Sequence, residues 1–284
     1  MVLTIDLGGT KLQYALFEGN SSIISITEPT QKDFVAQLQR IISSLVSKYP
    51  DLIDMMSIGV PGPIKNNVMQ GSKPLNCTKD IDFTIILNGF NIPFIVKNDL
   101  NMAVYYELHH GVGKRHKNFC LISLSTGIGV AVVNNGNILE GRIEMGHQVF
   151  FPEFQPQQAC TNHMNCWVSL ASGIGIERRF ATDKYQTTED IIENVLDKIQ
   201  IDEIKAMNAQ AFGNLINAYD PDVIVIMGSL GLKQFHKIIP DAKTMERFTI
   251  NRPVPKIIKC QAGNDIGIIG ANYAAYPKIV PLND

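Results

Sequence analysis

The sequence is short of the features that mark secreted, membrane-spanning and nucleic-acid-binding proteins. No stretch approaches the roughly 20 consecutive apolar residues of a membrane span, and the first residues lack the basic segment of a secretory leader. Lysine and arginine number 25 against 27 acidic residues, and no basic run stands out. The five cysteines are an odd number, which is typical of reduced thiols rather than a disulfide framework. We therefore expect a cytoplasmic protein with neither a membrane nor a nucleic acid as partner.

Strands and helices alternate along the 284 residues, which predicts an α/β protein of one or two domains. Apolar alternation and turn residues predict strands over 2–6, 12–17, 22–26, 56–60, 94–96, 119–124, 127–133 and 223–227. Apolar residues at helical spacing predict helices over 33–48, 167–180, 188–198, 202–219 and 263–275, with a further helix starting near 100. The stretch 152–165 has no clear periodicity and is predicted to be a loop.

A Gly-Gly turn between the first two strands is the first candidate site. The strand ends in Asp6, and Gly8, Gly9, Thr10 and Lys11 form the turn. Glycine lets backbone N–H groups approach phosphate oxygens, whereas Asp6 would act through Mg²⁺ because a carboxylate repels phosphate. The same spacing also suits an ordinary hairpin with polar flanks, and both interpretations stay open.

A second turn of the same kind lies between two later strands. Its hydroxyls and backbone N–H groups, from Ser125, Thr126, Gly127 and Gly129, suit the β- and γ-phosphates of a nucleotide. Glycine-serine turns between strands are more often structural. Because the device occurs twice, we expect two α/β halves with a phosphate held in a cleft between them.

Two further pairs of polar residues are candidates for work on a hydroxyl group. Asp99 follows a strand and precedes a helix, so its carboxylate is either a helix N-cap or a general base, and Asn98 would hydrogen-bond a sugar hydroxyl. Glu144 and His147, on a turn containing a glycine, suit vicinal hydroxyls, although a solvated turn explains them equally well.

Taken in order, these motifs resemble the ROK family (repressor, open reading frame, kinase) of sugar kinases and transcription factors. The resemblance also includes the segments 61–63, 171–173, 221–228 and 266–271 and so spans nearly the whole chain. It implies an actin-like ATPase (ribonuclease H-like) fold, with two α/β domains around a nucleotide cleft. The N-terminal domain would cover 1–110, with 264–284 returning to it, and the C-terminal domain would cover 111–263.

The resemblance implies ATP-dependent phosphorylation of a hexose or N-acetylhexosamine, of the glucokinase or N-acetylmannosamine kinase type, with Mg²⁺ and a homodimer. Asp99 then becomes the catalytic base that deprotonates the acceptor hydroxyl. Asn98, Glu144 and His147 would line the sugar site. Much of the catalysis would come from closure of the two domains, which excludes water and aligns the phosphoryl donor with the acceptor.

The resemblance also implies where the nucleotide binds. The turns 6–11 and 125–129 would hold the phosphates, and Gly228 would border the nucleotide. The glycines that usually follow the second turn are replaced here by Val130 and Ala131.

A metal site is the weakest part of the resemblance. The family pattern Cys-x-Cys-Gly-x-x-Gly-Cys-x-Glu is reduced to Cys160, His163 and Cys166, with Val168 in place of the acid. Together with His147 these residues would form a Cys₂His₂ zinc site, or else a degenerate loop without metal.

Three alternatives to a sugar kinase remain. A repressor of the same family would need a helix-turn-helix domain, for which we expect no room ahead of Asp6. A sugar- or nucleotide-binding protein without catalysis is favoured by the altered second turn and opposed by the retained Asp6 and Asp99. Another actin-like ATPase is disfavoured by the compact length. The sequence does not decide the sugar.

Overall fold

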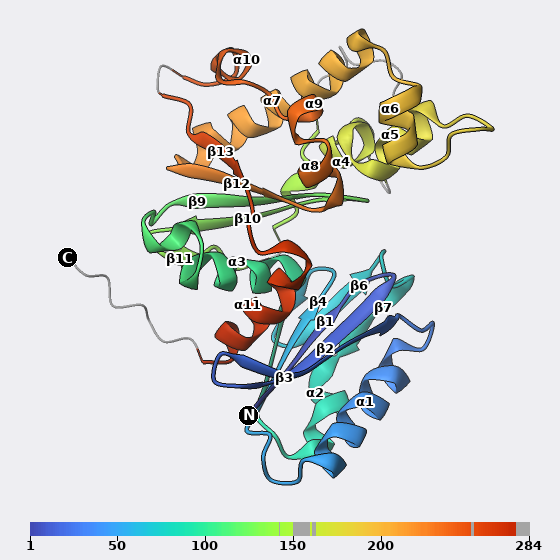
Figure 1. Ribbon diagram of the computed structural model, residues 1–284, viewed down its shortest axis with the longest axis vertical. Helices are drawn as coiled ribbons and strands as arrows, with labels where there is room; N and C mark the ends of the chain where they lie inside the picture. Colours follow the sequence, from blue (N-terminus) through green and yellow to red (C-terminus); the bar gives the residue numbers. More distant parts are fainter. Residues whose placement is uncertain (142, 150–159, 161–162, 251–252, 277–284) are drawn as a thin grey trace. The chain divides into compact units, whose positions relative to one another are not determined.

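The computed structural model describes residues 1–141, 143–149, 160, 163–250 and 253–276 and divides into two compact units (Figure 1). The first unit takes in Met1–Lys114, Glu140–Arg142 and the C-terminal segment from Ala262, and the second takes in Arg115–Leu139 and Ile143–Gln261. Both units are α/β. Among the described residues, no helix combines the length and the apolar character that a membrane crossing requires.

Each unit is built on a five-stranded sheet, and both sheets have the same strand order. An antiparallel meander of three strands comes first, and two later strands join it in parallel. The first sheet has the order β3-β2-β1-β4-β8, made of β1 (Val2–Leu7), β2 (Lys11–Glu18), β3 (Ser21–Pro29), β4 (Met55–Val60) and β8 (Phe94–Asn98). The second has the order β11-β10-β9-β12-β13, made of β9 (Phe119–Leu124), β10 (Ile128–Asn134), β11 (Asn137–Ile138), β12 (Val223–Met227) and β13 (Lys256–Lys259).

Helices cover both faces of the first sheet. On one face lie α1 (Phe34–Lys48) and α2 (Phe83–Leu87), and on the other α3 (Asp99–His109) and α11 (Ile266–Ala275), which run side by side in Figure 1. Alternation along β2 explains this arrangement, because Leu16 packs with α1 whereas Ala15 and Phe17 pack with α11. A three-stranded sheet of β5 (Ile64–Lys65), β6 (Val68–Ser72) and β7 (Cys77–Asp82) completes this unit, with η1 (Asn88–Phe90), η2 (Val112–Lys114) and η4 (Gly263–Asp265).

In the second unit the main hydrophobic core lies between the sheet and the helices that follow it. Trp167 and Phe212 are fully buried there, with their rings edge to face. The helices are η3 (Met145–His147), α4 (Trp167–Ala171), α5 (Gly173–Phe180), α6 (Thr188–Asn194), α7 (Lys198–Tyr219), α8 (Ser229–Lys233), α9 (Phe235–Ile238) and α10 (Ala242–Glu246).

Three predicted helix ranges are wrong, and one of them is that of α7, which is predicted over 202–219 and begins at Lys198. The helix predicted over 167–180 is two helices, because the Ser172 N–H closes α4 on Val168 O at 3.3 Å while its hydroxyl caps α5. The helix predicted over 188–198 ends at Asn194, since Asp197 opens α7 with a capping box. The loop predicted over 152–165 lies largely outside the described residues.

The contact between α11 and α3 leads to a first prediction. A Cβ atom on Gly270 would lie 1.9 Å from the carbonyl oxygen of Met102, which is backbone and has no room to yield. We expect Gly270→Ala to lower the free energy of unfolding by about 2–3 kcal/mol, seen as a lower thermal midpoint. Gly89→Ala is the control, because a Cβ there meets nothing within 4 Å and should leave the midpoint unchanged. Equal midpoints for the two variants would contradict the packing argument.

Candidate functional site

The first glycine turn joins β1 to β2 and is held from one side. The Gly8 N–H donates to Lys11 O at 2.9 Å, and Thr30 bonds the turn twice, through its hydroxyl to Gly8 O (2.7 Å) and through its N–H to Thr10 O (3.1 Å). Because C=O and N–H of a trans peptide point in opposite directions, the N–H groups of Gly9 and Lys11 face away from Thr30. The turn is therefore a hairpin and also presents backbone donors.

Asp6 lies near the end of β1, just before this turn, and its carboxylate is close to Gly59 and Gly267. A Cβ on Gly267 would lie 2.4 Å from its Oδ2, and one on Gly59 would lie 3.7 Å from its Oδ1. Burial raises the pKa of Asp6 to about 6, and the charge of Lys11 opposes the rise. A desolvated carboxylate of this kind suits a bound cation, so the residues present fit Mg²⁺.

Asn98 and Asp99 lie at the end of β8, where α3 begins. The N-cap is Asn98 and not Asp99, since Asn98 Oδ1 accepts from Leu100 N–H at 3.0 Å while its Nδ2 donates to Gly62 O at 3.1 Å. Asp99 occupies the first helical turn, and its Oδ1 also accepts from Leu100 N–H at 2.8 Å. The Asp99 backbone borders Gly59, whose Cβ would lie 3.4 Å from Asp99 Cα, so the structure brings Asp6 and Asp99 to the same edge of the first sheet.

The second glycine turn joins β9 to β10 and is held in a similar way. The first two N–H groups of α5, from Gly173 and Ile174, donate to Ser125 O (2.8 Å) and Thr126 O (3.1 Å). By the same peptide geometry, the N–H groups of Thr126 and Gly127 face away from α5. In both turns a neighbouring segment holds the carbonyl oxygens and leaves donors on the opposite side.

Motif glycines far apart in the sequence pack against this second turn. A Cβ on Gly146 would lie 2.0 Å from Ile128 O, one on Gly173 2.9 Å from Ser125 O, and one on Gly228 2.4 Å from Leu124 O. Gly228 also has a φ of +85°, which side chains rarely adopt. Gly127 differs, because a Cβ there meets nothing within 4 Å. Packing among the described residues does not explain the glycine at 127.

Glu144 precedes the 3₁₀ turn η3 and His147 is its last residue. Gly146 is buried against β10, whereas His147 is half-buried and Glu144 is exposed. Partial desolvation raises the pKa of Glu144, and His147 opposes the rise. The ring of His147 directs Nδ1 toward two sulfur atoms, Cys160 Sγ at 3.4 Å and Cys166 Sγ at 3.7 Å.

The four predicted metal ligands come together. One ligand atom each from His147, Cys160, His163 and Cys166 lies within 4.8 Å of all the others. Ligands of a tetrahedral zinc ion lie about 3.3–3.8 Å apart, which the two nitrogen–sulfur distances match. His163 Nε2 is buried and has no hydrogen-bond partner among the described residues. The donor set and this orphaned nitrogen both fit zinc.

Sequence reasoning did not identify Thr30, which holds the first glycine turn. It also did not identify Arg179, which ties α5, the helix bonded to the second turn, to α4 and α7. A threonine at a strand end and an arginine near a helix C-terminus carry no local signal of such a role. It also missed the hairpin of β6 and β7, whose Pro74 carbonyl would lie 2.6 Å from a Cβ on Gly9.

The chain is similar to both kinases and repressors. A glucokinase of Halalkalibacterium halodurans is 28% identical, with 95% of this chain and 93% of the relative covered. An N-acetylmannosamine kinase of Yersinia pestis is 22% identical, with 86% and 88% covered. A xylose repressor of Bacillus spizizenii is 27% identical over 79% of this chain, and the match spans only 60% of the repressor's length.

Solved structures show the same fold. A ROK hexokinase of Thermus thermophilus superposes with a TM-score of 0.79 at 24% identity, covering 97% of this chain and 98% of that one. A ROK glucokinase of Streptomyces griseus, in complex with glucose and AMPPNP, gives 0.74 at 18% identity, covering 97% and 100%. The chain therefore has the actin-like ATPase fold, as the sequence predicts. Since the ROK family model matches residues 2–277, nearly the whole chain, the protein belongs to the ROK family.

Proposed function

We propose that this protein is an ATP-dependent sugar kinase that transfers the γ-phosphoryl group to a hydroxyl of a hexose or N-acetylhexosamine. The observation that carries the proposal is the position of Asp99, in the first turn of α3 and at the same sheet edge as Asp6. The match to a glucokinase over nearly the whole of both chains supports it further, whereas the repressor match covers a smaller part.

Asp99 acts as the general base in this mechanism. Its carboxylate accepts the proton of the sugar hydroxyl as that oxygen attacks the γ-phosphorus. Asn98 cannot take this role, because an amide is not a base at neutral pH. Its amide retains one further N–H and one further lone pair beyond the bonds to Gly62 and Leu100, and these are available to a sugar hydroxyl.

The two glycine turns hold phosphate oxygens through their backbone N–H groups. Asp6 would hold Mg²⁺, which would neutralise negative charge on the phosphates. Thr10, Lys11 and Ser125 add side-chain donors beside the turns, and Gly228, which packs on the Leu124 carbonyl, borders the nucleotide. Each of these contacts would position the phosphates or stabilise their negative charge, and these two effects dominate the catalysis of phosphoryl transfer.

A second prediction concerns the unexplained glycine. A methyl group at position 127 meets no atom of the part of the chain that the structure describes within 4 Å, so Gly127→Ala should fold with an unchanged thermal midpoint. It would, however, obstruct the approach of a phosphate to the turn. We expect KM for ATP to rise about tenfold while KM for the sugar stays constant, measured by steady-state kinetics. An unchanged KM for ATP would remove this turn from the phosphate site.

Glu144 and His147 bind sugar hydroxyls, and the cluster of His147, Cys160, His163 and Cys166 binds zinc. The two roles of His147 are compatible, because Nδ1 faces the sulfur atoms and Nε2 is left as the donor to a hydroxyl. All four zinc ligands would come from the protein, so the ion would be structural and would carry no reacting group. Val168, where the family has an acid, leaves the choice between glucose and an N-acetylated hexosamine to experiment.

A coupled ADP-release assay with ATP and Mg²⁺ tests the proposal across a panel of hexoses and N-acetylhexosamines. We expect sugar-dependent ADP release with one or a few sugars. If no sugar is phosphorylated while calorimetry shows binding of sugar or nucleotide, the protein is a binding protein without catalysis. Val130 and Ala131, where family kinases carry glycines, are the residues that favour this alternative.

A further inference from the structure

The segment Ala171-Ser172-Gly173 and the helix that follows it have no role in the proposed reaction. Here α4 ends and α5 begins at one residue, with Ser172 Oγ donating to Val168 O (2.6 Å) and accepting from Gly175 N–H (3.2 Å). The next two N–H groups, at 173 and 174, hold the carbonyl oxygens of the second glycine turn. The direction of α5 therefore sets the direction in which the turn presents its donors.

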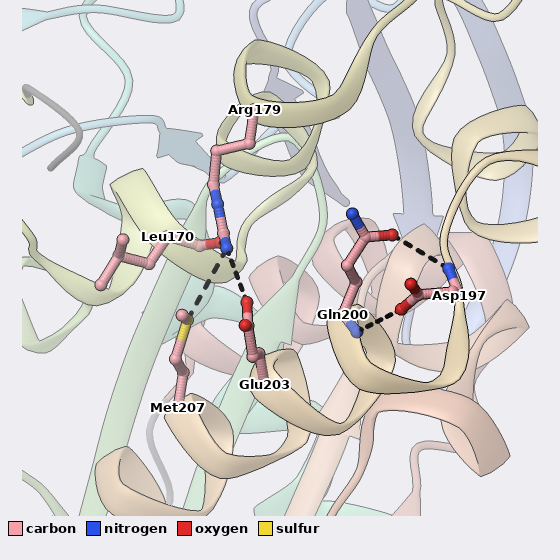
Figure 2. A network of polar contacts seen from close by, with 6 residues as sticks. All are labelled: Leu170, Arg179, Asp197, Gln200, Glu203 and Met207. Carbon is pink, nitrogen blue, oxygen red and sulfur yellow. Dashed lines mark hydrogen bonds and ion pairs between the residues drawn. The ribbon is translucent and has the colours of Figure 1, made fainter. Parts of the chain in front are cut away.

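Arg179 fixes the direction of α5 from its far end. Figure 2 shows its guanidinium between three helices, with Nη1 donating to Leu170 O of α4 (2.9 Å) and Nη2 to Glu203 Oε2 of α7 (3.2 Å). Nη1 also lies 3.9 Å from Met207 Sδ. Leu170 lies in the last turn of α4, where a carbonyl oxygen has no N–H partner within its own helix. One side chain thus ties the end of α4 and the side of α7 to α5.

Stability alone does not account for a charge at this place. The Arg179 side chain is 2% exposed, and its Nε is buried without a hydrogen-bond partner among the described residues. The partner Glu203 is 42% exposed, and an ion pair with one solvent-exposed partner gains little net free energy. What an apolar side chain cannot provide is the planar fork that reaches a carbonyl and a carboxylate at once.

We propose that Arg179 is a positioning residue for the turn 125–129: it holds α5 so that the N–H groups of Gly173 and Ile174 orient Ser125 and Thr126. The consequence for nucleotide binding rests on the proposed function, in which this turn holds phosphate. The positioning itself does not depend on that function and is measurable without ligand.

The test compares Arg179→Lys and Arg179→Met with Asp197→Ala. Lysine keeps the charge but loses the fork, and methionine fills the volume without charge. Asp197 caps α7 near Glu203 through Gln200, as Figure 2 shows, so its loss weakens the same helix without touching Arg179. Hydrogen exchange of the segment 123–131 is measured in the ligand-free proteins, and calorimetry gives Kd for AMPPNP with Mg²⁺.

We expect both Arg179 variants to exchange faster over 123–131 and to bind AMPPNP about tenfold more weakly, with Kd for the sugar unchanged. Asp197→Ala should lower the thermal midpoint and leave both readouts at the wild-type value. If the Arg179 variants lower the midpoint but match wild type in exchange and Kd, Arg179 is merely structural and the inference is overturned.

Two further results separate the inference from the proposed function. Faster exchange in a protein whose wild type binds no nucleotide would uphold the positioning role and refute the phosphate role of the turn. If neither Arg179 variant folds, Glu203→Ala replaces them, since Glu203 is 42% exposed and alanine removes the acceptor of the Nη2 bond. Unaltered exchange in Glu203→Ala would then count against the proposal.

Discussion

Replacing Asp99 by asparagine is expected to lower kcat for sugar phosphorylation by about 10²–10⁴-fold, the usual contribution of a general base. Asparagine has nearly the same shape, and its Oδ1 accepts the Leu100 N–H just as the carboxylate does. The variant should therefore fold normally and keep the wild-type Kd for AMPPNP. Loss of turnover with intact binding would be the specific signature of a missing base.

Asp82→Asn is the matched control. Asp82 caps α2 in the same unit by accepting the Thr84 N–H at 2.8 Å, and asparagine is as good a cap as aspartate. Both variants lose one carboxylate at a helix start, but only the change at 99 should lower kcat. An Asp99→Asn enzyme with full turnover would refute the assignment of the base.

Removing the metal should have the largest effect on stability. We expect the purified protein to carry one zinc ion per chain and Cys166→Ser to lose it, with a decrease of about 3–5 kcal/mol in the free energy of unfolding and of about 10 °C in the thermal midpoint. Cys166 is also the N-cap of α4, with Sγ accepting from Ser169 N–H. Serine is a good cap, so the loss would report the ligand and not the cap.

Cys77→Ser controls for the loss of a thiol. Cys77 lies in β7 of the first unit, outside the cluster, and its Sγ contacts only Lys79 O among the hydrogen bonds described for it. This variant should keep its zinc and its midpoint. Elemental analysis measures the zinc content of wild type, Cys166→Ser and Cys77→Ser, and differential scanning calorimetry measures their thermal midpoints. A wild type that holds no metal, and whose midpoint a chelator does not change, would argue for a degenerate loop.

The sequence predicts the elements whose patterns are strong. The strands β1, β2, β9 and β12 and the helix α1 have clear periodicity, and the structure has all of them. The resemblance to the family's zinc motif predicts the four residues of the metal cluster, and the structure brings them together.

The features that the sequence missed depend on contacts between distant segments. The strands β5 to β7 are short and polar, and β13 has only four residues, so neither has enough alternation to be recognised. After the break at Ser172, the N–H groups of Gly173 and Ile174 donate to Ser125 O and Thr126 O, which lie far earlier in the sequence. Arg179 follows another arginine at a helix end, where such residues are normally exposed.

The position of α11 has a consequence for biosynthesis. This helix packs on α3, β1 and β4 of the first unit, and Asn272 Nδ2 donates to Gly19 O at 2.8 Å across 253 residues of sequence. A nascent chain leaving the ribosome therefore completes the core of its second unit before that of its first. Until Ile266–Ala275 emerges, the apolar face formed by Val2, Ala15 and Phe17 stays exposed. We expect a chaperone that binds apolar surface to act during this interval.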